Sequence, residues 1–168
     1  MEQMHYTIGV LTLSDKGASG DRIDESGPLL GELAAGLGDI VRYQIVADDE
    51  EKISLLLKSW VDDLNLNLIL TTGGTGLSPR DVTPQATTAI LDYQIPGMAE
   101  AMRRVSMEKT PHGMLSRAVV GVRKRSLIIN LPGSPKGVRE NFTVVLPALP
   151  HALAKLNGDS ADCAEVVV

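Results

Sequence analysis

The stretch "LNLILTTGGTGLSPRDVTPQAT", residues 66–87, decides the fold. It begins with a short apolar run that ends at two threonines, which predicts a buried strand. Three glycines follow within four residues, and Arg80, Asp81 and the pair Thr83-Pro84 come next. Glycine permits positive φ angles and close approach of the backbone, so this loop could direct its N–H groups at phosphate oxygens. The same pattern also occurs in plain flexible turns, so the surrounding sequence must distinguish the two.

The rest of the chain repeats the change from strand to helix. Further strand candidates are "YTIGVLTL" (6–13), "DIVRYQIV" (39–46), "AVVGV" (118–122) and "SLIIN" (126–130). Apolar residues at helical spacing predict helices over 29–37, 53–64, 83–92 and 98–105, and another after Ser134. Strands that alternate with helices of this length are typical of right-handed βαβ units. We therefore expect an α/β fold with a mostly parallel central sheet.

The ends of the predicted helices have recognisable signals. Four residues are expected to cap helix N-termini: Ser26, Asp49, Thr83 and Ser134. Prolines lie in the first turn after several of these caps, and Gly38 is expected to end the first helix. Pro147 and Pro150 are expected to break or kink the last helical region. Residues 14–25 are expected to form a polar loop.

The composition favours one globular domain. The chain has 168 residues, of which 43% are hydrophobic and only 3% aromatic, so the core must be aliphatic. No linker-like segment interrupts the sequence, and we expect a single domain over residues 1–157. The last residues, 158–168, are small and acidic and are expected to form a loose tail.

The charge restricts the partners. The net charge is −5, no dense stripe of Lys and Arg is present, and aromatics for base stacking are few, so we expect no nucleic-acid or membrane partner. The single cysteine, Cys163, excludes a disulfide framework. The first residues lack a signal-peptide pattern, and we expect a cytoplasmic location. An anionic ligand would need backbone N–H groups, a few basic side chains or a divalent metal.

Four polar segments are expected to meet at one place. Segments 14–15, 48–49, 73–81 and 132–136 all follow predicted strands. In an open parallel sheet, ligands bind beyond the carboxyl ends of the strands. If the sheet is parallel, these segments share one rim.

The residues alone leave the roles of the polar side chains open. Asp81 could bind Mg²⁺ or could be a solvated carboxylate near a helix start. Asp48 could belong to the shared rim or, with its acidic neighbours, complement a helix dipole. Ser134 and Lys136 could bind an anion or serve as a cap and a surface lysine, and Ser116-Arg117 could also bind an anion. The three histidines are isolated, without the spacing of a metal-binding pair.

Three long motifs add a resemblance. "VLTLSDKGASGDRIDESGPLL" (10–30), "TTGGTGLSPRDVTPQAT" (71–87) and "LIINLPGSPKGVRENF" (127–142) resemble the MogA/MoaB family of molybdopterin-binding proteins. The resemblance runs from about Gly9 to Ala154. It implies a three-layer α/β sandwich that usually assembles as a homotrimer.

The resemblance also implies an activity in molybdenum cofactor biosynthesis. Active members of the family are molybdopterin adenylyltransferases, which use Mg²⁺ and ATP to transfer AMP to the terminal phosphate of molybdopterin and release pyrophosphate. The product would pass to a separate molybdate-insertion protein. The alternative is a non-catalytic module that binds molybdopterin without adenylylating it, and a purely structural scaffold is a third reading.

The family motifs place roles on individual residues. By resemblance, Asp81 and Asp48 match two aspartates that are required for adenylyl transfer and are expected to hold the metal. Ala47 departs from the proline that many members have before the second of these aspartates. Ser116 matches a serine associated with the pterin. The remaining expected substrate- and nucleotide-binding residues are Ser14, Asp15, Gly73, Gly74, Thr75, Gly76, Pro132, Gly133 and Ser134.

Overall fold

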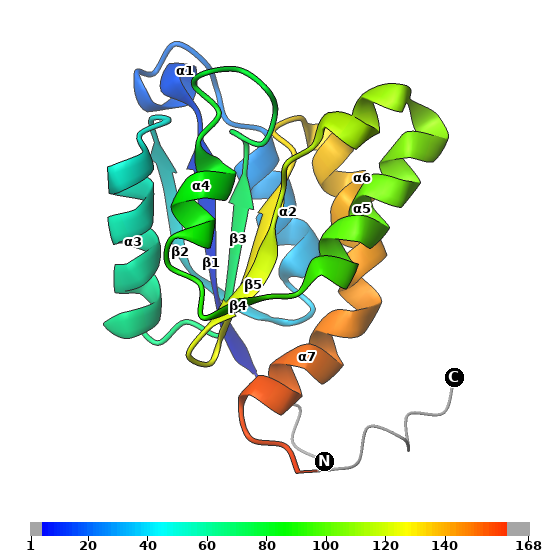
Figure 1. Ribbon diagram of the computed structural model, residues 1–168. Helices are drawn as coiled ribbons and strands as arrows, with labels where there is room; N and C mark the ends of the chain where they lie inside the picture. The colour runs from blue at the N-terminus through cyan, green and yellow to red at the C-terminus, as the bar shows by residue number, and fades with distance from the viewer. Residues whose placement is uncertain (1–4, 161–168) are drawn as a thin grey trace.

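A computed structural model describes residues 5–160 of the chain (Figure 1). Within these residues the strands form one six-stranded sheet in the order β2-β1-β3-β6-β5-β4. The strands are β1 (Tyr6–Leu13), β2 (Gly38–Val46), β3 (Leu68–Thr72), β4 (Tyr93–Gln94), β5 (Val120–Arg123) and β6 (Ser126–Leu131). β1 pairs in parallel with β2 and with β3, and β3 pairs in parallel with β6. β5 pairs antiparallel with β4 and with β6. The prediction of a mostly parallel sheet is confirmed.

Helices cover both faces of the sheet. They are α1 (Asp15–Ala18), α2 (Ser26–Ala34), α3 (Glu50–Asp62), α4 (Thr83–Thr88), α5 (Pro96–Lys109), α6 (Pro135–Val145) and α7 (Leu149–Leu156), with 3₁₀ turns η1 (Pro111–Leu115) and η2 (Leu146–Ala148). In Figure 1, α3 and α4 lie on one side of the sheet and α2, α5 and α6 on the other. This is the three-layer arrangement that the resemblance implies.

The strands bury alternate residues on opposite faces. Leu68 and Leu70 of β3 pack with α2, α5, α6 and α7, whereas Ile69 packs with α3 and α4. Leu127, Ile128 and Ile129 divide in the same way. Burial on both faces explains why these strands are continuous apolar runs in the sequence. The strand β2 lies at the edge and is exposed over most of its length.

Two predicted helix caps are confirmed. The carboxylate of Asp49 accepts from the N–H of Lys52 at 3.0 Å, at the start of α3. The hydroxyl of Ser134 accepts from the N–H of Gly137 at 3.1 Å, at the start of α6. The break at Pro147 is also confirmed, since η2 separates α6 from α7. Pro150 does not break the helix, because it lies in the first turn of α7.

Two other predicted caps are wrong. Ser26 is the first residue of α2, and Asp24 accepts from its N–H instead. Thr83 is the first residue of α4, and its hydroxyl donates to the carbonyl of Gly73 at 2.9 Å. The Ser26 hydroxyl donates to the carbonyl of Gly133 at 2.7 Å, so in both cases the hydroxyl binds a loop carbonyl and is not available to its own helix.

The remaining differences concern short elements. The helix at 83 ends at Thr88 and not near Asp92, and Gly38 begins β2. The expected polar loop over 14–25 contains α1, and β4 was not predicted. Of the predicted tail at 158–168, the part after residue 160 lies outside the described residues. Within residues 5–160, no helix is long and apolar enough to cross a bilayer.

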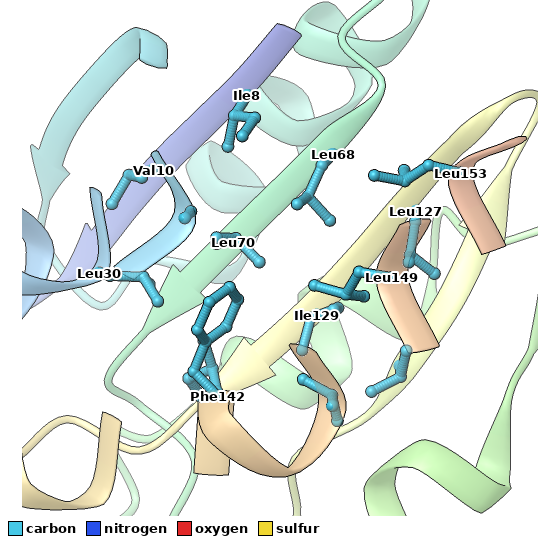
Figure 2. Close-up of a cluster of buried hydrophobic side chains, with 14 of the residues drawn as sticks. Ile8, Val10, Leu30, Leu68, Leu70, Leu127, Ile129, Phe142, Leu149 and Leu153 are labelled. Carbon is cyan, nitrogen blue, oxygen red and sulfur yellow. The ribbon is translucent and has the colours of Figure 1, made fainter. Parts of the chain in front are cut away.

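Phe142 provides a test of the core. Its ring is fully buried against strand and helix side chains, among them Leu70 and Ile129 (Figure 2). Replacing a buried phenylalanine with alanine leaves a cavity, so Phe142→Ala should lower the free energy of unfolding by about 3–5 kcal/mol. Urea denaturation measures this loss. Leu55→Ala is the control, because Leu55 is 58% exposed and should change stability little; equal losses in the two variants would contradict this packing.

Candidate functional site

The carboxyl ends of four parallel strands surround one cleft. Its volume is about 530 Å³. Eight of the predicted site residues line it: Ser14, Asp15, Asp48, Gly73, Gly74, Asp81, Gly133 and Ser134. They come from the segments after β1, β2, β3 and β6, as the parallel sheet requires. In particular, Asp48 and Asp81 face the same cleft, although they are 33 positions apart in the sequence.

The other four predicted residues line a second hollow of about 420 Å³. These are Thr75, Gly76, Ser116 and Pro132. Ser134 lines both hollows. The glycine loop, residues 73–76, contributes its first two residues to the first hollow and its last two to the second. The structure therefore divides the predicted residues between two adjoining spaces.

The second hollow contains residues that the sequence did not single out. Lys109 lies at the end of α5, and its Nζ forms an ion pair with the Glu140 carboxylate of α6 at 2.8 Å. Ser106 and Asn141 exchange hydrogen bonds between the same two helices. Lys136, a candidate anion ligand from the sequence, also lines this hollow. The packing of α5 against α6 creates this wall, so spacing along the chain gave no signal for it.

Glycine is required at the tip of β3. Gly73 and Gly74 have φ angles of +100° and +65°, where other residues are strained. A Cβ at Gly74 would overlap the Thr83 hydroxyl and lie 2.9 Å from Oδ1 of Asp48. The loop therefore passes closely over the Asp48 carboxylate, which a larger residue would displace.

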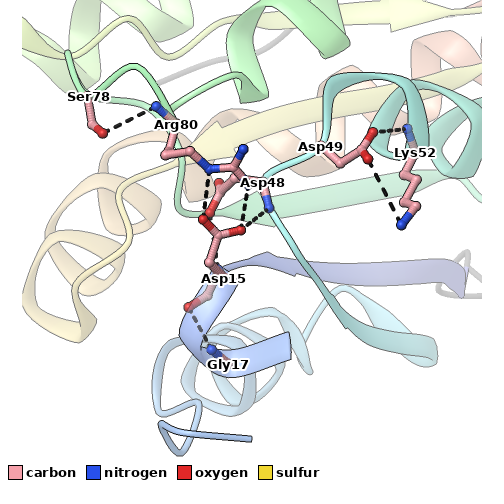
Figure 3. A network of polar contacts seen from close by, with 8 residues as sticks. Asp15, Gly17, Asp48, Asp49, Lys52, Ser78 and Arg80 are labelled. Atoms are coloured by element: carbon pink, nitrogen blue, oxygen red, sulfur yellow. Dashed lines mark hydrogen bonds and ion pairs between the residues drawn. The ribbon is translucent and has the colours of Figure 1, made fainter. Parts of the chain in front are cut away.

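Asp15 and Asp48 hold each other in place (Figure 3). The N–H of Asp48 donates to Oδ1 of Asp15 at 3.0 Å, and the N–H of Asp15 donates to Oδ2 of Asp48 at 3.2 Å. The Arg80 guanidinium binds Asp15 through two hydrogen bonds of 2.9 Å. These bonds, with the Asp48 amide, lower the pKa of the Asp15 carboxyl. Both carboxylate oxygens of Asp15 thus accept hydrogen bonds from protein donors.

Asp48 differs, because one of its oxygens has no partner. Its Oδ1 is buried and accepts no hydrogen bond from the protein. Burial raises the pKa of the Asp48 carboxyl, and the nearby charges of Asp15 and Asp81 raise it further, against the lowering effect of the Asp15 amide and Arg80. An unpaired buried acceptor is unfavourable unless a ligand completes it. This oxygen is therefore the clearest sign of a binding site in the cleft.

The loop that carries Asp81 is held by Arg117. The guanidinium donates to the carbonyl of Gly76 at 2.8 Å and to the carbonyl of Asp81 at 2.6 Å. The Asp81 carboxylate accepts from the N–H of Ser78 through Oδ2, which leaves Oδ1 for a ligand. Arg117, an anion-binding candidate from the sequence, here binds backbone oxygens of the glycine-rich loop.

A further aspartate lines the cleft without capacity for a ligand. Asp24 accepts from the hydroxyls of Thr12 and Tyr43 at 2.6 Å each, and from the N–H groups of Ser26 and Gly27. Burial alone would raise the pKa of Asp24, but these hydrogen bonds outweigh it and lower the pKa. Burial, together with the hydrogen bond to Asp24 and the charge of that carboxylate, raises the pKa of Tyr43 to about 12. All four acceptor positions are used, so Asp24 shapes the cleft wall.

The donor set fits a magnesium ion. Within residues 5–160, no three His, Cys, Asp or Glu side chains cluster to form a metal site of protein ligands alone. Mg²⁺ commonly takes one or two carboxylates and completes its shell with waters and substrate phosphates. Asp48 and Asp81 both line the cleft, and each has a carboxylate oxygen to which no described protein group donates, which matches that requirement.

Comparison with known proteins assigns the family. Residues 9–151 match the model of a family described as "Probable molybdopterin binding domain". The chain belongs to this molybdopterin-binding family. A solved structure of MoaB from Thermus thermophilus is 50% identical, superimposes with a TM-score of 0.87, and corresponds to 92% of this chain and 98% of that one.

Other members of the molybdopterin-binding family carry informative names. The molybdopterin adenylyltransferase of Helicobacter pylori (strain J99) is 40% identical over 95% of this chain and 91% of its own length. The protein of the same name from Escherichia coli K12 is 36% identical, over 96% and 90%. Gephyrin from Dictyostelium discoideum is 43% identical over 93% of this chain, but the match spans 23% of that larger protein.

The raised pKa of Asp48 predicts how its replacement changes the stability of the protein. Because the folded-state pKa of Asp48 is raised, the ionised side chain destabilises the native state at pH values above that pKa, and the penalty disappears below the ordinary pKa of aspartate. Asp48→Asn should therefore raise the free energy of unfolding at pH 7 but not at pH 3. Urea denaturation at both pH values measures the difference. Asp24→Asn is the matched control, and it should lower the free energy of unfolding at pH 7, because the pKa of Asp24 is lowered. A stability loss at pH 7 in Asp48→Asn would contradict the assignment.

Proposed function

We propose that this protein is a molybdopterin adenylyltransferase of molybdenum cofactor biosynthesis, dependent on Mg²⁺ and ATP. The observation that carries the proposal is the buried, unpaired Oδ1 of Asp48, in one cleft with Asp81 and beside the glycine loop. Relatives that match over nearly their full length are named for this activity. An acidic protein that joins two anions needs a cation at the point where they meet.

The proposed reaction is a simple displacement at phosphorus. An oxygen of the terminal phosphate of molybdopterin attacks the α-phosphorus of ATP and forms the new P–O bond. The bond from the α-phosphorus to the bridging oxygen breaks, and its electron pair leaves with pyrophosphate. The protein forms no covalent bond to either substrate, so its contribution is positioning and charge neutralisation.

Each part of the cleft has a role in this proposal. Mg²⁺, when bound by Asp48, Asp81 and phosphate oxygens, would neutralise charge on ATP and on the leaving pyrophosphate. Backbone N–H groups of the glycine loop would orient the phosphates. Asp15 keeps Asp48 in place, and Arg117 holds the backbone of the loop that carries Asp81.

The two hollows suggest where the substrates bind. We assign the nucleotide to the first cleft, with Ser14, Gly133 and Ser134 among its walls. We assign the pterin to the second hollow, where Ser116 lies with Pro132. Ser134 lines both, so the reacting phosphates would meet near this residue. The product would then pass to a separate protein that inserts molybdate.

Removing either proposed metal ligand should abolish transfer. With molybdopterin, ATP and Mg²⁺, the protein should form adenylyl-molybdopterin, detected by chromatography. Asp81→Ala and Asp48→Ala should each lower turnover by about 100-fold or more, since positioning of the reacting groups supplies most of the catalysis. Binding of molybdopterin, followed by fluorescence, should largely persist. The control is Asp63→Ala, an exposed aspartate at the end of α3.

The same assay identifies the alternatives. If folded wild-type protein binds molybdopterin but forms no product, and neither aspartate variant alters binding, the protein is a non-catalytic molybdopterin-binding module. If it binds neither molybdopterin nor ATP, the scaffold interpretation replaces both.

We further infer a homotrimer, as in the family that the motifs resemble. Analytical ultracentrifugation should give three times the chain mass of 17.9 kDa. A concentration-independent monomer would contradict this assembly.

A further inference from the structure

Arg80 connects two parts of the cleft wall. It lies in the glycine-rich loop, and its Nε and Nη2 atoms donate to the two carboxylate oxygens of Asp15 at the start of α1, each at 2.9 Å (Figure 3). The two residues are 65 positions apart. Arg80 is not among the residues that line the cleft, so its place in the fold does not itself indicate contact with a substrate.

The contacts continue from Asp15 to Asp48. Oδ1 of Asp15 accepts from both Arg80 and the N–H of Asp48, while the N–H of Asp15 donates to Oδ2 of Asp48. Arg80, Asp15 and Asp48 thus form one continuous chain of hydrogen bonds. At its end lies Oδ1 of Asp48, the buried oxygen without a partner.

The charges show why Arg80 matters in this chain. The carboxylates of Asp15 and Asp81 both act unfavourably on the ionised Asp48, and Arg80 acts favourably. Without the guanidinium, two carboxylates joined by reciprocal backbone hydrogen bonds would face each other with no cation between them. Like charges at this distance repel, so Asp15 would turn away and release Asp48.

We propose that Arg80 is a positioning residue, which fixes Asp15 against Asp48 so that Oδ1 of Asp48 stays available to the metal and its nucleotide. This inference rests on the proposed function. Arg80 acts through Asp15 and does not bind the phosphates. The planar guanidinium contacts both carboxylate oxygens, which a lysine ammonium cannot reproduce with the same geometry.

The variants that test this role should fold. The Arg80 and Asp15 side chains are 63% and 43% exposed, and exposed ion pairs contribute little to stability. Asn at position 15 keeps an oxygen that can accept from the N–H of Asp48 but loses the charge that Arg80 binds. Thermal denaturation of each variant verifies folding, and Arg80→Lys provides a conservative second variant.

A double-mutant cycle separates positioning from direct phosphate binding. Arg80→Ala, Asp15→Asn and the double variant are compared in kcat and in KM for ATP. Calorimetry also measures their affinity for a non-hydrolysable ATP analogue with Mg²⁺. Arg80→Ala should lower kcat about 10- to 100-fold with a smaller change in KM. The double variant should be no worse than the more impaired single variant, because both changes break the same chain. Arg80→Lys should recover part of the loss.

The control is Arg104→Ala on α5, which removes one exposed positive charge away from the cleft and should leave kcat unchanged. Additive losses in the cycle, or a rise in KM with kcat unchanged, would overturn the proposal, since either shows that Arg80 binds ATP itself. If the wild-type protein transfers no AMP, the proposed function fails, and the calorimetric cycle alone then decides whether Arg80 acts through Asp15.

Discussion

The parallel alignment of β1, β3 and β6 is the constraint on which the site depends. Thr12, Thr72 and Leu131 occupy one level across the three strands, so the loops that follow leave the sheet together. The loops are then joined: the Thr72 hydroxyl donates to the carbonyl of Pro132 at 2.6 Å, and the N–H of Gly73 donates to the carbonyl of Leu131 at 3.1 Å. Gly133 is so close that a Cβ there would lie 3.2 Å from Cα of Gly73. The cleft is therefore a consequence of strand register and of small residues at the strand ends.

The electrostatics of the cleft favour a bound cation, and they are unfavourable to the stability of the protein without it. The net charge of −5 and the four aspartates that line the cleft, Asp15, Asp24, Asp48 and Asp81, would repel an anionic substrate. The fold does not relieve this repulsion at Asp48, whose Oδ1 is left buried and unpaired. Proteins keep such locally unfavourable groups where function requires them. By contrast, both carboxylate oxygens of Asp15 and of Asp24 accept hydrogen bonds from protein donors, and these two residues hold the walls.

Much of this organisation could be predicted from the sequence, and the exceptions share a physical cause. Continuous apolar runs predicted β1, β3 and β6 because burial on both faces requires them. The predicted caps at Ser26 and Thr83 failed because their hydroxyls bind Gly133 and Gly73, contacts that local patterns do not encode. The four loops were expected at one rim and do line one cleft. The second hollow was not expected, because it depends on how α5 packs against α6. The positions of Arg80 and Asp24 likewise become informative only when their distant partners are known.

The central claim is that Asp48 and Asp81 bind one cation between the two substrates. The most direct test is a crystal structure of the protein with Mg²⁺ and a non-hydrolysable ATP analogue. The account predicts one ion bound by a carboxylate oxygen of each aspartate and by phosphate oxygens, at about 2.1 Å from its ligands. An analogue whose phosphates lie outside the cleft, or an ion held without either aspartate, would contradict it.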